Sequence, residues 1–105
     1  MGHYVLIVQS EAKPGRGEEY ARWYASEHLA HVCAIPGVKS GRRFEALPAV
    51  IGKSGSRYLA IYEIEAEDPH TVTAELQKRA SEGTMNVSDA LDRESVISWL
   101  YQAKP

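Results

Sequence analysis

The sequence predicts an α+β domain in which two helices cover one face of a four-stranded antiparallel sheet, with the element order β-α-β-β-α-β. Three observations predict it. Residues 3–9 and 57–66 are rich in β-branched and aromatic side chains, as strands are. Residues 18–35 have helical periodicity and end at Pro36-Gly37. Asp68-Pro69 combines an N-cap residue with a proline at the first helical position.

The first half of the chain begins with a strand at residues 3–9, whose two alternating sets of side chains are both mainly apolar. Residues 13–17 contain a proline and two glycines and are therefore expected to turn the chain. The first helix follows, because Glu18 and Glu19 are acidic residues at the end where the helix dipole favours negative charge.

The second half is expected to continue the sheet. A strand is predicted at residues 38–47, with a bulge at Gly41. Residues 48–56 form a loop, and the strand at 57–66 follows with Tyr58, Ala60, Tyr62 and Ile64 on one face. The second helix ends at Gly83. A connection at 84–92 lacks periodicity, and the last strand is expected at 94–101.

This order is the split βαβ arrangement of ferredoxin-like domains, and one such domain accounts for residues 1–105. The last strand carries Ile97, Trp99 and Tyr101 on one side and Val96 and Leu100 on the other. Apolar side chains on both faces of the outer strands predict that the face without helices is covered by a second copy of the chain.

Composition excludes several kinds of partner. Twelve basic and 14 acidic side chains give a net charge of −2 and form no long runs, so neither nucleic acid nor a membrane surface is an expected partner. Cys33 is the single cysteine, which excludes an internal disulfide. The N-terminal residues lack the pattern of a signal peptide, and a cytoplasmic location is expected.

The first helix carries the residues of chemical interest. At about 100° per residue, one sector contains Tyr24, His28, His31 and Ile35, with Trp23 and Glu27 on its near flank. The opposite half contains Arg22, Ala25, Ser26, Leu29 and Cys33. A helix that turns aromatic and titratable groups toward a sheet forms either a hydrogen-bonded core or the wall of a pocket.

Four segments together resemble the EthD-like group of the dimeric α/β-barrel superfamily. They are the motif W-Y-x-x-x-H at residues 23–28, Pro-Gly-Val at 36–38, Arg-Arg-Phe at 42–44 and the strand 58–63. The resemblance implies a homodimer whose two sheets close into a barrel, with a pocket between the first helix and the sheet of each subunit. It also implies action on small, often aromatic or polyketide-like molecules as monooxygenases, isomerases, cyclases or lyases, commonly without a metal.

His28 and Tyr24 are the expected catalytic residues, with His28 as general acid/base. The expected substrate-binding residues are Arg43, Tyr62, His31 and Trp23. Each has a structural alternative: a hydrogen-bonded core histidine for His28, an ion pair between Arg43 and Glu27, and packing for the aromatic residues. His28 and His31 are spaced to share a metal, but the sequence places no third ligand beside them. Neither a metal nor a nucleotide cofactor is expected.

These features favour a small homodimeric, cofactor-independent enzyme of the lyase, isomerase or monooxygenase type, acting on a small apolar or aromatic oxygenated substrate of catabolism or polyketide-like biosynthesis. The alternative is a noncatalytic small-molecule-binding or accessory protein of such a pathway. A third possibility is a haem-handling protein of the same superfamily, which requires an asparagine near the first strand. The single asparagine in the sequence is Asn86.

Overall fold

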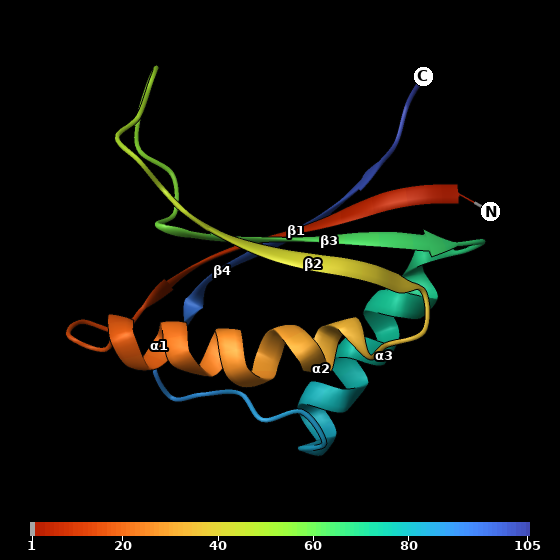
Figure 1. Ribbon diagram of the computed structural model, residues 1–105, viewed down its shortest axis with the longest axis horizontal. Helices are drawn as coiled ribbons and strands as arrows, with labels where there is room; N and C mark the ends of the chain where they lie inside the picture. Colours follow the sequence, from red (N-terminus) through yellow and green to blue (C-terminus); the bar gives the residue numbers. More distant parts are fainter. Residues whose placement is uncertain (1) are drawn as a thin grey trace.

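The computed structural model describes residues 2–105 and contains one four-stranded antiparallel sheet in the order β2-β3-β1-β4. Strand β1 (Gly2–Ala12) lies in the middle, between β3 (Tyr58–Ala66) and β4 (Leu91–Gln102), and β2 (Val38–Glu45) pairs with the other side of β3. The helices all lie on one side of this sheet (Figure 1). The ferredoxin-like βαββαβ fold predicted from the sequence is confirmed.

The first helix is continuous in space but changes its winding in the middle. It consists of α1 (Gly17–Trp23), a π-helical turn η1 (Tyr24–His28) and α2 (Leu29–Cys33). The amide of Leu29 donates to the carbonyl of Tyr24, five residues earlier, as a π turn requires. The hydroxyl of Ser26 donates to the carbonyl of Arg22 at 2.6 Å.

The π turn corrects the predicted helix face. Because the turn contains one residue more than an α-helical turn, later residues are rotated by about 100° from their positions in a uniform helix. Cys33, expected on the outer half, therefore faces the sheet, where its sulfur lies near Gly41 and Tyr62. Glu27, expected on the flank of the core-facing sector, is exposed.

Gly41 is required for space rather than for a bulge. A Cβ at this position would lie 2.9 Å from Sγ of Cys33 and 2.8 Å from the ring of Tyr62, closer than side-chain atoms approach. Gly41 itself pairs with Tyr62, and the register of β2 shifts between Val38 and Ser40. The predicted bulge at Gly41 is therefore wrong in its position.

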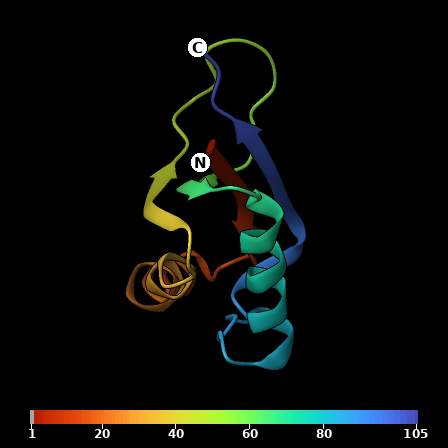
Figure 2. The ribbon, with the colours of Figure 1, turned by 90° about the vertical axis from the view of Figure 1, so that its right-hand side faces the viewer.

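Helix α3 (Pro69–Glu82) begins and ends where the sequence indicates. The carboxylate of Asp68 accepts the amide of His70 at 3.0 Å, and Gly83 ends the helix with a φ of 78°. Figure 2 shows the first helix end-on and α3 from the side, so the two helices cross on the same face of the sheet. No helix in residues 2–105 combines the length and apolar character needed to span a membrane.

The opposite face of the sheet is apolar and uncovered. Trp99 is 62% exposed and Ile97 and Tyr101 are each 53% exposed, all on β4, and Phe44 of β2 is 39% exposed. The loop between β2 and β3 extends on this side, away from the helices (Figure 1). It adds further apolar side chains that are almost fully exposed: Leu47, Val50 and Ile51. A patch of this kind is typical of a protein interface.

We expect the chain to form a homodimer through this face. Sedimentation at micromolar concentration should give twice the mass of the chain. Trp99→Glu should shift the equilibrium toward monomer by at least tenfold in dissociation constant, because it places a charge between Ile97 and Tyr101 in the apolar patch.

The matched control is Ala74→Glu, which adds the same charge at an exposed position on α3, on the opposite side of the sheet. This variant should remain dimeric. A wild-type protein that sediments as a stable monomer would contradict the interface.

Candidate active site

A pocket of about 260 Å³ lies between the first helix, helix α3 and the sheet. Its walls come from β1, the first helix, β3, α3, the segment 84–90 and β4. The lining is mainly apolar, and its chemically active members are Trp23, Tyr24, His28 and Tyr62. Ligand pockets for drug-sized molecules start at about 300 Å³, so this volume suits a small ligand.

Tyr24 and Tyr62 form a hydrogen-bonded pair across the junction of helix and sheet. Their hydroxyl oxygens are 2.8 Å apart, and the two residues are only 4% and 1% exposed. Burial raises the pKa of Tyr24 to about 12 and also raises the pKa of Tyr62, so both hydroxyls are protonated at neutral pH. The hydrogen bond between them uses one of the two protons. The second proton is available to donate to a ligand oxygen.

His28 is held against two aromatic rings. Its ring stacks on Trp23 with centroids 4.6 Å apart and meets the edge of Tyr24 at 4.9 Å. Trp23 and His28 are five residues apart and would point in different directions on an α-helix. The π turn brings them to the same side, because it repeats at about five residues.

The imidazole of His28 is neutral at pH 7. Burial, assisted by the nearby His31, lowers its pKa to about 4. Its Nδ1 is buried and has no hydrogen-bond partner within residues 2–105. Nε2 is not among the buried atoms that lack a partner in the described residues, and His28 lines the pocket, so Nε2 is the ring nitrogen that we consider for contact with a ligand.

The segment 84–90 closes one wall of the pocket and is tied to the first helix by Asn86. The indole N–H of Trp23 donates to the carbonyl of Asn86 at 3.0 Å, and the side-chain amide of Asn86 donates to Glu27 at 3.0 Å. Met85, which lines the pocket, is thereby held in the core with 2% exposure. The predicted ion pair between Glu27 and Arg43 does not form within the described residues.

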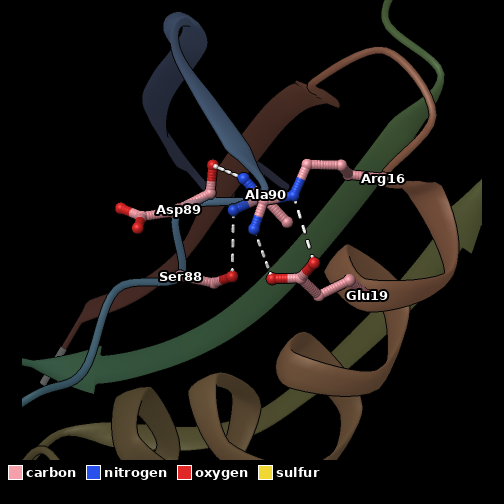
Figure 3. A network of polar contacts seen from close by, with 5 residues as sticks. All are labelled: Arg16, Glu19, Ser88, Asp89 and Ala90. Carbon is pink, nitrogen blue, oxygen red and sulfur yellow. Dashed lines mark hydrogen bonds and ion pairs between the residues drawn. The ribbon is translucent and has the colours of Figure 1, made fainter.

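The end of this segment is fixed by a second group of polar contacts (Figure 3). Arg16 donates to the carbonyl of Asp89 at 3.3 Å and pairs with Glu19 on α1. The hydroxyl of Ser88 accepts the amide of Ala90 at 3.0 Å. Both ends of the segment are thus attached to the first helix or to the turn before it, which keeps the wall in place.

Two of the predicted substrate-binding residues lie outside the pocket lining. The guanidinium carbon of Arg43 lies 5.4 Å from the centre of the Tyr24 ring, in a cation-π contact. Arg42 points to the other face of the sheet, over Phe44. His31 also lies outside the lining, and its Nδ1 is buried without a hydrogen-bond partner in the described chain. The pocket lining therefore includes His28, Tyr24, Tyr62 and Trp23, but not Arg43 or His31, which lie beside Tyr24 and His28 outside the lining.

Sequence reasoning missed the polar residues that complete the lining. These are Ser10 on β1, Thr73 and Gln77 on α3, and Ser98 on β4. Ser10 continues the alternation of Tyr4, Leu6 and Val8, so its inward orientation was readable from the strand pattern. Within residues 2–105, no three His, Cys, Asp or Glu side chains are close enough to hold a metal ion.

No model of a known protein family matches the sequence, and no curated protein matches it. Several solved structures are similar. An EthD family protein from Bacillus halodurans C-125 is 11% identical over 99% of this chain and 100% of its own, with a TM-score of 0.65. The heme-degrader MhuD from Mycobacterium tuberculosis, with two hemes bound in its active site, is 18% identical over 95% and 94%, with a TM-score of 0.65.

A dimeric ferredoxin-like protein from Thermobifida fusca YX is 10% identical over 97% of this chain and 92% of its own, with a TM-score of 0.57. This chain shares their fold. The predicted resemblance to EthD-like proteins is confirmed at that level.

The depressed pKa of His28 predicts a pH dependence of stability. The unfolded chain takes up a proton near the ordinary value of 6.5, whereas the folded chain does so near 4, so the stability contributed by the neutral ring is present above 6.5 and lost as pH falls toward 4. Between pH 7 and roughly pH 4.5 the wild type should lose about 2 kcal/mol more than His28→Gln, measured by urea unfolding.

The control is His3→Gln, because the side chain of His3 is 67% exposed and its contact with Glu65, at 3.3 Å, is a surface contact that contributes little to stability. It should follow the wild-type curve over the same range. Equal pH dependence in wild type and His28→Gln would show that His28 is not buried as described.

Proposed function

We propose that the protein is a small homodimeric enzyme that transfers a proton on a small, mainly apolar, oxygenated substrate without a cofactor. One observation carries this proposal: a neutral imidazole and a tyrosine pair with a spare hydroxyl proton line the same pocket. A proton acceptor and a hydrogen-bond donor in one pocket are the two groups that enolisation of a carbonyl compound requires.

The reaction follows from these groups. In the neutral tautomer that carries its proton on Nδ1, Nε2 of His28 accepts a proton from a C–H bond next to a carbonyl group, and the electron pair of that bond moves onto the carbonyl oxygen. The free hydroxyl proton of the Tyr24–Tyr62 pair hydrogen-bonds this oxygen as its negative charge develops. The imidazolium then returns its proton at another position, which completes an isomerisation.

The low pKa of His28 both supports and limits this role. It keeps the ring unprotonated and able to accept a proton at neutral pH, and it makes the imidazolium acidic enough to return that proton to the substrate quickly. It also makes the ring a weak base, since general acid-base catalysis is most effective when the pKa is near the working pH. This second effect favours the alternative, a noncatalytic accessory protein of a cytoplasmic catabolic or biosynthetic pathway in which the pocket only holds its ligand.

A haem-handling function receives less support from the site. Asn86 lies on the segment 84–90 rather than near β1, and its side chain is engaged with Glu27. The heme-degrader MhuD shares the fold, which shows that such a scaffold carries an enzyme active site in that protein. The residues of this chain are better suited to proton transfer on a smaller molecule.

Replacement of His28 distinguishes enzyme from binder. On a substrate found by mass spectrometry in a panel of small apolar ketones and β-diketones, His28→Gln should keep the affinity within a few-fold and lower turnover by about two or more orders of magnitude, because glutamine accepts no proton. Tyr24→Phe should give a smaller loss.

His31→Gln is the matched control, since it removes the neighbouring histidine outside the pocket lining. It should retain turnover within a few-fold. Normal turnover in His28→Gln would reject His28 as the base, and binding without turnover of any panel compound would favour the accessory protein.

A further inference from the structure

The pocket contains no charged side chain. Among the described residues that line it, none is Asp, Glu, Lys or Arg, although a quarter of the whole sequence is charged. Its polar members are all neutral: hydroxyl groups, the amide of Gln77 and the imidazole of His28. A ligand in this pocket therefore meets hydrogen-bonding groups but no compensating charge.

One cation lies close to these groups but contacts an aromatic ring. Arg43 comes from β2 and places its guanidinium over the ring of Tyr24, and it does not line the pocket. Tyr24 lines the pocket. Its ring contacts Arg43, and its hydroxyl group is hydrogen-bonded to Tyr62. The contact stabilises the position of Tyr24, and the charge of Arg43 opposes the larger effect of burial on the pKa of the Tyr24 hydroxyl. Arg43 does not line the pocket, so its guanidinium is not placed to pair directly with a ligand carboxylate.

Helix ends do not replace the missing charge. Helix α3 spans 69–82 and contributes Thr73, Leu76, Gln77 and Ala80, which lie beyond its first turn. The unpaired amides that bind anions occur in the first turn of a helix. A carboxylate moved from water into such surroundings, without a partner, is strongly disfavoured.

We propose that this pocket selects uncharged ligands, namely small, mainly apolar molecules with a hydroxyl or carbonyl oxygen for the tyrosine pair, and rejects the corresponding carboxylates. The argument rests on the pocket being the ligand site of the proposed function, and it does not depend on turnover. In this proposal neither Arg43 nor His31 contacts the ligand, in contrast to the role predicted for them from the sequence.

The test compares 2-naphthol with 2-naphthoate by isothermal titration calorimetry on the full chain. At about pH 7 the carboxylic acid is ionised and the naphthol is not, while the ring systems are the same. Wild type should bind 2-naphthol at least tenfold more tightly than 2-naphthoate.

Adding a positive charge tests whether the selectivity arises in this pocket. Gln77→Arg adds a cation at the exposed rim of the pocket and should raise the affinity for 2-naphthoate at least fivefold, while the affinity for 2-naphthol changes less than twofold. Ala74→Arg adds the same charge to an exposed position of α3 outside the lining and should leave both affinities unchanged.

Wild type that binds 2-naphthoate as well as 2-naphthol would overturn the proposal. So would binding of neither compound, or an equal effect of the two arginine variants. If the preference for 2-naphthol is found but His28→Gln turns over normally, charge selection stands and the catalytic proposal fails, so the two are separable.

Discussion

The hydrogen bond between the hydroxyl groups of Tyr24 and Tyr62 joins the first helix to the sheet at the pocket, and the geometry of the site depends on it. In a chain of this size, two buried tyrosine hydroxyls would be costly without partners. By pairing with each other, they meet this requirement and still leave one proton free. Arg43 and His28 both contact the Tyr24 ring, so the hydrogen bond that fixes Tyr24 also helps to fix their positions.

The π turn is the second constraint. It positions His28 at the pocket and lowers the stability of the fold. It puts His28 against Trp23 and leaves Nδ1 of both His28 and His31 buried without partners within the described chain. Such atoms reduce stability and are uncommon in native cores. Their presence beside a pocket is consistent with a site that uses an imidazole, since an apolar side chain at the same position would pack without this cost.

Most of the fold was predictable because it depends on local patterns. Alternation placed Tyr58, Ala60, Tyr62 and Ile64 inward, and Asp68 and Gly83 marked the ends of α3. The motif around Trp23 and His28 also located the pocket. The orientation of Cys33 was missed because one additional residue in a helical turn rotates everything after it, and the sequence has no signal for that turn. The contacts of Glu27 with Asn86 and of Arg43 with Tyr24 were missed because they join distant segments.

The charge state of His28 is the quantity on which the proposed chemistry depends most directly. It can be measured by ¹⁵N NMR of the imidazole rings, with the His28 signal assigned by comparison with His28→Gln. The structure predicts a neutral ring throughout the neutral range and a titration midpoint near 4. A midpoint at 6.5, the value of an ordinary histidine, would show that the ring is solvated and would contradict the proposed role of His28 as a buried, neutral proton acceptor.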